Sequence, residues 1–340
     1  MNTWLFISLA LVAITSFFLT AAVRTYALRI QMIDQPVERS SHSIPTPRGG
    51  GLGFVVTFLL GGVLHALWFS SHDYQPLGLL LAAFLVAGIG FMDDHQHIPA
   101  RWRLLVHILA ACLLLWAIPV PETAALFGVL LEDVLYIPIV VLALVWLINL
   151  FNFMDGIDGI ASIEAVSVLL VAGYLLLDAQ ATGQAILLFG LAAAVAGFLY
   201  WNLPPAKVFM GDVASGFLGL MLGGAALLCW QQGSHYLVAI LIMLAVFIVD
   251  ATCTLLVRLA TGQRVFDAHR LHGYQKLTAM WGSHGRVSYG VLDINLLWLC
   301  PLALLAAHLP TQSFWLLGIA YAPLLVGVIY LRAGLLEEEK

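Results

Sequence analysis

Apolar residues run along this chain in long blocks separated by short polar segments. Each block is close to the roughly 20 residues that an α-helix needs to cross a bilayer. The pattern predicts an all-α integral membrane protein with about eleven transmembrane helices in one domain, residues 1–340. The predicted spans are Trp4–Val23, Leu52–Phe69, Leu77–Phe91, Leu104–Val120, Leu135–Phe151, Ile160–Leu177, Ala185–Tyr200, Val213–Cys229, Tyr236–Val257, Val287–Leu305 and Phe314–Leu331.

Composition excludes a soluble protein. Hydrophobic residues make up 62% of the chain and charged residues 10%, against about 45–50% and about 25% in soluble domains. We therefore expect the protein to be embedded in the lipid bilayer, which is its first predicted partner. The net charge of -5 argues against nucleic acid as a partner. The four cysteines all fall inside apolar blocks, so the sequence indicates neither a disulfide framework nor a zinc site.

The basic residues predict an orientation. All 14 Lys and Arg residues fall on alternate connections between the predicted spans, or in the C-terminal tail. Under the positive-inside rule that side is cytoplasmic. We therefore expect a periplasmic N-terminus and a cytoplasmic C-terminus, with His72 and Asp178 outside and Lys276 inside.

The polar clusters also gather on the predicted cytoplasmic side. Asp93 and Asp94 close the third block, where two adjacent carboxylates repel each other and favour a bound cation. A solvated helix end is the alternative. Carboxylates at a membrane boundary are costly, so we treat them first as candidates for function.

The most specific cluster follows the fifth block. Its oxygen-bearing side chains recur every three residues and are interrupted by glycines that permit a bend. The alternative is a capped turn between two helices. The cluster consists of Asn149, Asn152, Asp155, Asp158, Gly156 and Gly159.

A third cluster opens the eighth block. Asp212 lies at its start, a few residues after Lys207. It is either an N-cap or a carboxylate that shares a metal ion with the earlier clusters, with Lys207 beside a phosphate. Oxygen ligands without cysteine suit a hard cation, Mg²⁺ or Mn²⁺.

Basic residues on the same side suit a diphosphate, although a positive-inside loop would carry them in any case. Asp250, inside the ninth block, is interpreted as structural, pairing toward the end of its helix. Arg48 stands beside three glycines that open the second block, a weak sign of a phosphate-accepting helix start. The long loop after the ninth block carries Arg264, His269, Arg270, His272 and Lys276.

Together these groups select phosphoryl chemistry at the cytoplasmic boundary. A secondary transporter also combines bent helices with acidic residues, but its ion sites lie near the midplane. A CDP-alcohol phosphotransferase would need an arginine soon after Asp158-Gly159, and the chain has none there.

With these motifs in place, the chain resembles the polyprenyl-phosphate N-acetylhexosamine-1-phosphate transferases. The shared marks, in order, are Asp93-Asp94, the Asn-x-x-Asn-x-x-Asp-Gly-x-Asp-Gly run, Phe209-Met210-Gly211-Asp212 and the histidine-bearing loop. The resemblance implies transfer of a sugar-1-phosphate from a UDP-N-acetylhexosamine to undecaprenyl phosphate, with release of UMP. It also implies Mg²⁺ dependence and a bacterial inner membrane.

Carried over by position, the resemblance implies a role for each residue. Asp212 would be a metal ligand, joined by Asp93, Asp94, Asn152 and Asp155. Asp93 would activate the lipid phosphate, with Asp94 beside it. The implied catalytic residues are Asp93, Asp94, Asp155, Asp158 and His272, and the implied substrate-binding residues are Asn149, Asn152, Lys207, Arg48, Arg264, His269, Arg270, Tyr274, Gln275 and Lys276.

One departure narrows the substrate. His272 matches the first histidine of a family signature, whereas Tyr274 and Gln275 replace the other two. That form is similar to O-antigen initiators that use UDP-GlcNAc, UDP-FucNAc or UDP-QuiNAc. It argues against the alternative, the muramoyl-pentapeptide transferase of peptidoglycan synthesis. The sequence leaves open whether the chain forms a homodimer.

Overall fold

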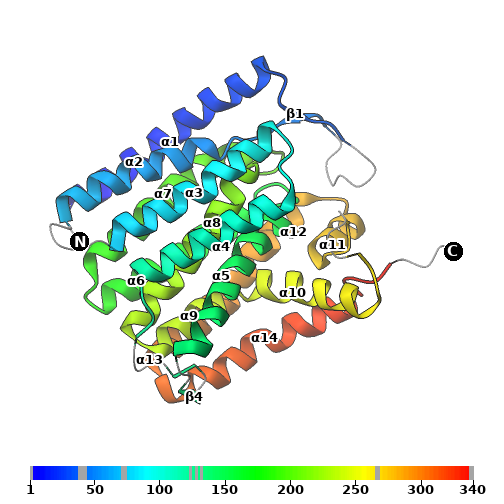
Figure 1. Cartoon of the computed structure of the whole chain (residues 1–340). Coiled ribbons are helices and arrows are strands. Elements are labelled where there is room, and N and C mark those ends of the chain that lie inside the picture. Colours follow the sequence, from blue (N-terminus) through cyan, green and yellow to red (C-terminus); the bar gives the residue numbers. More distant parts are fainter. Residues whose placement is uncertain are drawn as a thin grey trace.

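The computed structural model describes residues 3–36, 44–69, 75–121, 125–126, 129–130, 133–264 and 269–336. The chain forms a bundle of helices that run between two opposite ends of the molecule (Figure 1). Its long helices are α1 (Thr3–Arg29), α2 (Leu52–Phe69), α3 (Gln75–His95), α4 (Ala100–Ala117), α5 (Asp133–Met154), α6 (Ile160–Asp178), α7 (Thr182–Asn202), α8 (Asp212–Gln232) and α14 (Ser313–Tyr330).

The remaining elements are shorter. The only strands in the described ranges are two antiparallel pairs, in which each strand has two residues. The expectation of an all-α fold therefore holds for the described part of the chain. The short elements are β1 (Ile33–Asp34) with β2 (Thr46–Pro47), β3 (Ala125–Leu126) with β4 (Val129–Leu130), α9 (Ser234–Met243), α10 (Ala245–Ala260), α11 (Gly273–Trp281), α12 (His284–Ile294), the π-helix η1 (Asn295–Leu299), α13 (Cys300–His308) and the 3₁₀-helix η2 (Pro310–Gln312).

Helices occupy all eleven predicted blocks, but fewer qualify as complete spans. Within the described residues nine helices are long and apolar enough to cross a membrane, with α12, η1 and α13 acting as one. The pair α9 and α10 would make a tenth, although it bends by 71°. The apolar segment of α2, Leu52–Trp68, is shorter than these spans and is not counted among them. The structure thus supports nine to ten spans rather than eleven.

Helix α8 forms the centre of the bundle. Its membrane-length segment is entirely buried, whereas only 11% of the corresponding segments of α1 and α14 is buried. In Figure 1 α1 and α14 lie on opposite edges of the bundle. Small residues let neighbouring helices approach α8 closely. A Cβ built on Gly219, for example, would lie 2.4 Å from the backbone oxygen of Leu147 in α5.

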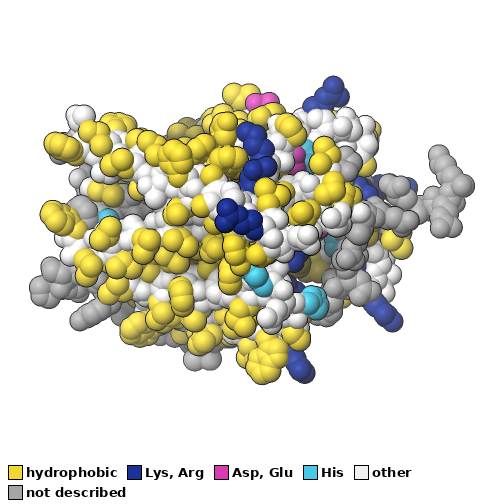
Figure 2. All heavy atoms as spheres, turned by 90° about the horizontal axis from the view of Figure 1, so that it is seen from above, with side chains coloured by type: hydrophobic (Ala, Val, Ile, Leu, Met, Phe, Trp, Pro, Cys, Tyr) yellow, Lys and Arg dark blue, Asp and Glu magenta, His cyan; other side chains and the backbone are white. Residues whose placement is uncertain are grey.

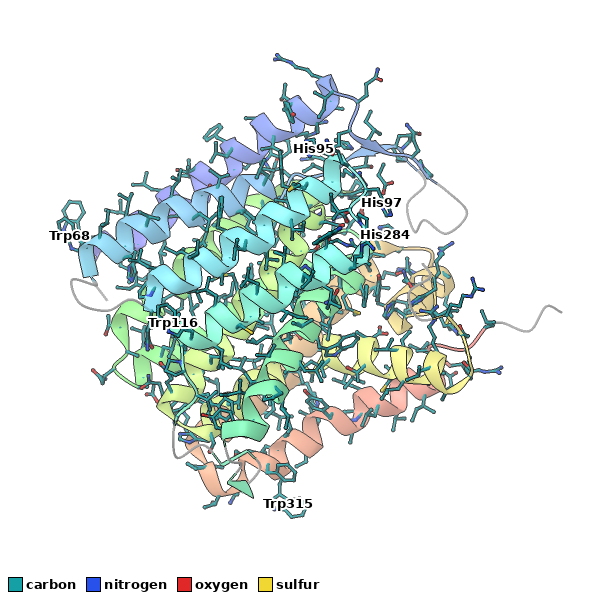
Figure 3. All side chains as sticks on the ribbon, in the orientation of Figure 1. Trp68, His95, His97, Trp116, His284 and Trp315 are labelled. Atoms are coloured by element: carbon teal, nitrogen blue, oxygen red, sulfur yellow. The ribbon has the colours of Figure 1, made fainter. Side chains whose placement is uncertain are left out.

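The two ends of the bundle differ in chemistry. The described part of the chain begins and ends at opposite ends of the molecule (Figure 1). Figure 2 shows the Lys and Arg side chains gathered toward one end. Trp68, Trp116 and Trp315 lie away from that end, whereas His284 lies at it (Figure 3). These tryptophans are 73–84% exposed, as expected of aromatic side chains at a membrane interface.

Candidate active site

A polar cavity of about 280 Å³ lies at the basic end of the bundle. The ends of α3 and α5, the start of α8 and the first turns of α11 and α12 converge on it. Its lining residues are Asp34, Arg48, Asp94, Asn152, Asp155, Gly156, Ile157, Asp158, Asn202, Phe209, Met210, Gly211, Asp212, Ser215, Gln275 and His284.

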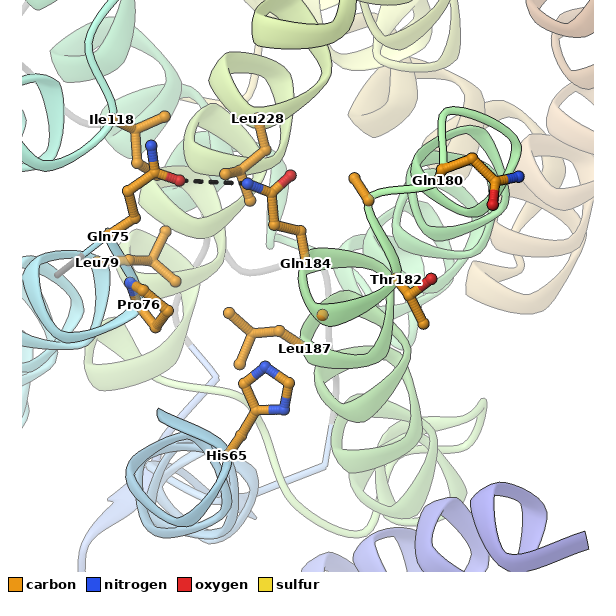
Figure 4. Close-up of a pocket in the computed structure, with 12 residues that line it drawn as sticks. His65, Gln75, Pro76, Leu79, Ile118, Gln180, Thr182, Gln184, Leu187 and Leu228 are labelled. Atoms are coloured by element: carbon orange, nitrogen blue, oxygen red, sulfur yellow. Dashed lines mark hydrogen bonds between the residues drawn. The ribbon is translucent and has the colours of Figure 1, made fainter. Parts of the chain in front are cut away.

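A second cavity of about 280 Å³ lies at the other end of the bundle (Figure 4). There the side-chain amide of Gln184 donates to Gln75 at 3.2 Å, and Gln75 donates to Gln231 at 3.4 Å. None of the described residues that line it is a carboxylate. The carboxylate-lined cavity is therefore the candidate active site.

Asp94 fixes the start of α8. Its two oxygens accept hydrogen bonds from the consecutive backbone N–H groups of Asp212 and Val213, at 3.1 and 3.0 Å. These are groups that a helix start leaves without partners of its own, and the carboxylate also complements the helix dipole. Asp94 is 4% exposed. The N-cap that we considered for Asp212 is thus supplied by Asp94 from α3.

The approach of α3 to α8 depends on Gly90. A Cβ built on Gly90 would lie 2.2 Å from the backbone oxygen of Asp212. Gly211, just before α8, has a φ of +82°, a conformation that favours glycine. The two glycines allow Asp94 to reach the first turn of α8.

The Asp212 carboxylate faces the cavity between two partners, Asn152 and Arg103. Its Oδ1 accepts a hydrogen bond from the Asn152 amide at 2.7 Å, and that amide also donates to the Ser215 hydroxyl at 3.0 Å. Its Oδ2 lies 3.5 Å from the Arg103 guanidinium. Two clusters that lie 60 residues apart in the sequence therefore meet here.

Asp93 lies beside the cavity rather than in its wall. One oxygen accepts from the backbone N–H of Ile98 at 2.7 Å, and the other lies 2.5 Å from the Arg103 guanidinium. Arg103 therefore bridges Asp93 and Asp212. The role of Asp93 toward the lipid phosphate stays a prediction.

Asp155 and Asp158 lie on the turn between α5 and α6. Burial, together with the nearby carboxylates of Asp212, Asp94 and Asp158, raises the pKa of Asp155 well above its usual value. Such a concentration of like charge favours either a proton or a metal cation at this point.

The Asp158 side chain is held from two sides. One oxygen accepts from the backbone N–H of Ala206 at 2.9 Å, and the other lies 3.0 Å from Nδ1 of His284. The Asn202 oxygen accepts hydrogen bonds from the Gly159 backbone and the Ser162 hydroxyl at 3.1 and 3.2 Å. Contacts from α7, α12 and the segment before α8 therefore fix the position of this turn in the cavity wall.

The donor set fits Mg²⁺. In the part of the chain that the structure describes, no three His, Cys, Asp or Glu side chains form a metal cage. Mg²⁺ at phosphate sites, however, is usually held by one or two carboxylates together with substrate phosphates and water. Asp155 and Asp212 line one cavity and could supply those carboxylates, with the amide oxygen of Asn152 as a neutral donor.

The histidine-bearing loop leads into helix α11, which covers one side of the cavity. Gln275 lines the cavity and accepts from the backbone N–H of His272 at 3.3 Å. Tyr274 is buried, and its hydroxyl donates to the backbone oxygen of Phe153 at 2.9 Å. Of the two residues that depart from the family signature, Gln275 is in the wall and Tyr274 lies behind it.

Several predicted substrate-binding residues are not among those that line the cavity. Asn149 donates to the backbone oxygen of Val145 within its own helix. The Lys207 ammonium lies 4.2 Å from the centre of the Tyr200 ring. The Lys276 ammonium donates to the backbone oxygen of Arg332 at 2.7 Å.

The loop residues Arg264, His269 and Arg270 also lie outside the cavity lining. Burial and the nearby His272 and Arg258 lower the pKa of His269 to about 4, so its ring is neutral at pH 7. The roles of these residues in substrate binding stay predictions.

Five polar residues of the site were not among the candidates predicted from the sequence: Asp34, Arg103, Asn202, Ser215 and His284. Arg103 counted only as a basic loop residue, and His284 lies beyond the histidine signature. Ser215, three residues after Asp212, had the helical spacing that would have placed it on the same face. Asn202, at the end of α7, carried no comparable signal.

Comparison with known proteins identifies the family. Residues 76–230 match the model for glycosyl transferase family 4. The chain is 31% identical to the decaprenyl-phosphate N-acetylglucosaminephosphotransferase of Mycolicibacterium smegmatis, over 91% of this chain and 84% of that one. It is 26% identical to a probable undecaprenyl-phosphate N-acetylglucosaminyl 1-phosphate transferase of Bacillus subtilis, over 80% and 76% of the two chains.

The peptidoglycan branch matches as well. A phospho-N-acetylmuramoyl-pentapeptide-transferase of Streptococcus pneumoniae is 27% identical, over 89% of this chain and 90% of that one. Relatives named for two different sugar substrates thus match most of this chain. The protein belongs to glycosyl transferase family 4 and is a multi-pass membrane enzyme that transfers a phospho-sugar.

Proposed function

We propose that this protein transfers an N-acetylhexosamine-1-phosphate from a UDP-sugar to undecaprenyl phosphate and releases UMP. The reaction would begin the assembly of O-antigen or a related envelope glycan at the bacterial inner membrane. The observation that carries the proposal is the cavity where Asp94, Asp155, Asp158 and Asp212 meet. It lies at the basic end of a membrane-spanning bundle, where a lipid phosphate and a cytosolic nucleotide can both arrive.

The reaction exchanges one phosphoanhydride bond for another. An oxygen of the lipid phosphate attacks the phosphorus that bears the sugar, and the bond from that phosphorus to the UMP oxygen breaks. UMP leaves with the electron pair, and the lipid carries a diphosphate-linked sugar. Substrate charge is high throughout, so the chemistry depends on positioning and on charge neutralisation.

The residues divide this work. Asp155 and Asp212 would hold Mg²⁺, which neutralises phosphate charge when it is bound. Arg48 lines the cavity, and its guanidinium donates to the backbone oxygen of Asp94 at 2.7 Å, so it is our candidate for a phosphate contact. Asp93 is the candidate acceptor for a proton of the lipid phosphate.

Purified protein tests the proposal directly. We expect UMP release when undecaprenyl phosphate, UDP-GlcNAc and Mg²⁺ are all present, and none when any one is left out. Efficient turnover of UDP-muramoyl-pentapeptide would instead assign the protein to the peptidoglycan branch. Movement of a solute without UMP release would favour a transporter.

Tyr274→His is expected to change the ratio of activities with UDP-GlcNAc and with a 6-deoxy UDP-N-acetylhexosamine. The tyrosine hydroxyl holds the backbone of Phe153, between the cavity residues Asn152 and Asp155, and an imidazole cannot make the same contact. Initial rates with the two donors measure the ratio. Tyr274→Phe, which removes only the hydroxyl, is the matched comparison, and an unchanged ratio in both variants would remove Tyr274 from donor selection.

We infer that the basic end faces the cytosol, because basic residues stay on that side of bacterial membranes. A membrane-impermeant thiol reagent applied to intact cells should label a cysteine at position 178 and not one at position 276. His72, also expected outside, falls beyond the described residues. Labelling at 276 with protection at 178 would reverse the orientation, and the parent protein gives the background from its own four cysteines.

A further inference from the structure

Asp250, in α10, is 5% exposed and is not among the residues that line the cavity. It is nevertheless surrounded by donors. Its oxygens accept from the backbone N–H groups of Gly273 and Tyr274, both at 2.8 Å. The Thr254 hydroxyl donates at 3.2 Å, and Nδ1 of His272 lies 3.3 Å away. The structure therefore directs Asp250 toward the start of α11 rather than toward the end of its own helix.

This arrangement repeats that of Asp94. In both cases a buried carboxylate from one helix accepts from two consecutive N–H groups at the start of another. A carboxylate at such a position satisfies free donors and complements the helix dipole. The helix that Asp94 fixes presents Asp212 to the cavity. The helix that Asp250 fixes presents Gln275.

Helix α11 is also coupled to the backbone that carries the other site residues. The Tyr274 hydroxyl donates to the backbone oxygen of Phe153, and a Cβ built on Gly156 would lie 2.1 Å from that hydroxyl oxygen. Tyr274 thus packs so closely against the segment between Asn152 and Asp158 that no side chain would fit at Gly156. A shift of α11 would displace this segment together with Gln275.

We propose that Asp250 is a positioning residue for the nucleotide-sugar: it holds the start of α11 so that Gln275 and the 152–158 segment keep the geometry that binds the donor. The inference rests on the proposed function and deepens it, because it assigns this side of the cavity to the UDP-sugar rather than to the lipid. Asp250 itself touches no substrate.

The test compares Asp250→Asn with the unmodified protein. Asparagine keeps the size and one acceptor oxygen, but its NH₂ group cannot accept from the second backbone N–H. Loss of a charge-assisted hydrogen bond should raise KM for UDP-GlcNAc about tenfold. KM for undecaprenyl phosphate should stay unchanged. Asp293→Asn, an exposed position in α12, is the matched control and should leave both constants unchanged.

Thr254 provides a milder second variant in case Asp250→Asn does not fold. Thr254→Val removes one donor to Asp250 and keeps the shape of the side chain. It should raise the same KM by about threefold, whereas Thr254→Ser, which keeps the hydroxyl, should not. The unfolding temperature of each variant shows whether that variant is folded.

The outcomes separate the two proposals. If the unmodified protein releases no UMP, the proposed function fails. If it does release UMP, a selective rise in KM for the UDP-sugar supports the role of Asp250. Equal changes in both KM values, or normal constants in folded Asp250→Asn and Thr254→Val, would overturn it.

Discussion

The Asp212→Asn variant is expected to lose turnover by about a thousandfold, equivalent to about 4 kcal/mol of transition-state stabilisation. Asparagine fits the same space and can still accept from Asn152, but it brings no charge to the cation and places an NH₂ group near Arg103. Removing a metal-binding charge from a phosphoryl-transfer site costs several kcal/mol. The rate of UMP release, measured across Mg²⁺ concentrations, gives the loss.

Asp178→Asn is the matched control for this experiment. Asp178 ends α6 at the far end of the bundle, where Tyr236 donates to it at 3.3 Å. The same change of charge there should leave turnover unchanged. Near-normal turnover of Asp212→Asn at low Mg²⁺ would show that Asp212 does not hold the metal.

Asp94→Ala is expected to lower both stability and turnover. It leaves the N–H groups of Asp212 and Val213 without their acceptor in a buried place, at a cost of about 3 kcal/mol in the free energy of unfolding. It also frees the first turn of α8, which aims Asp212 at the cavity, so turnover should fall by at least about a hundredfold. Thermal unfolding in detergent and UMP release measure the two effects.

Asp94→Asn separates the cap from the charge. Its single amide oxygen can still accept from one N–H group, so it should unfold between the alanine variant and the unmodified protein. If Asp94→Ala unfolds at the temperature of the unmodified protein, Asp94 does not stabilise the start of α8.

The sequence predicted the helical blocks well because the length of an apolar run is a local property. Breaks inside those blocks were not predictable. No proline or glycine marks Leu244, where α9 and α10 meet at 71°. The π-helix η1 begins at Asn295, whose amide donates to the buried carboxylate of Glu164 in α6 at 2.7 Å. Both features depend on neighbours that are distant in sequence.

The candidate site was predictable as a set of clusters but not as a set of contacts. Asp94, Asn152, Asp155, Asp158 and Asp212 were expected to come together, and all five line one cavity. The four aspartate carboxylates among them are costly in a membrane and so stand out in the sequence.

Long cationic side chains were harder to place. Lys207 lies over aromatic rings, and Lys276 binds backbone oxygens near the end of α14. A flexible ammonium can reach any of several acceptors within its radius. Only the three-dimensional arrangement decides which acceptor it finds, so charge in a loop did not predict a place in the cavity.

Gly90 controls how closely α3 approaches the start of α8. It lies one turn before Asp94 and touches the backbone of Asp212 without a side chain between them. A single methyl group at this position would act as a wedge, pushing the start of α8 away from α3 and widening the gap between the carboxylates that they carry. The distance between the carboxylates of α3 and α8 thus depends on the absence of a side chain at Gly90, a residue that takes no part in the reaction.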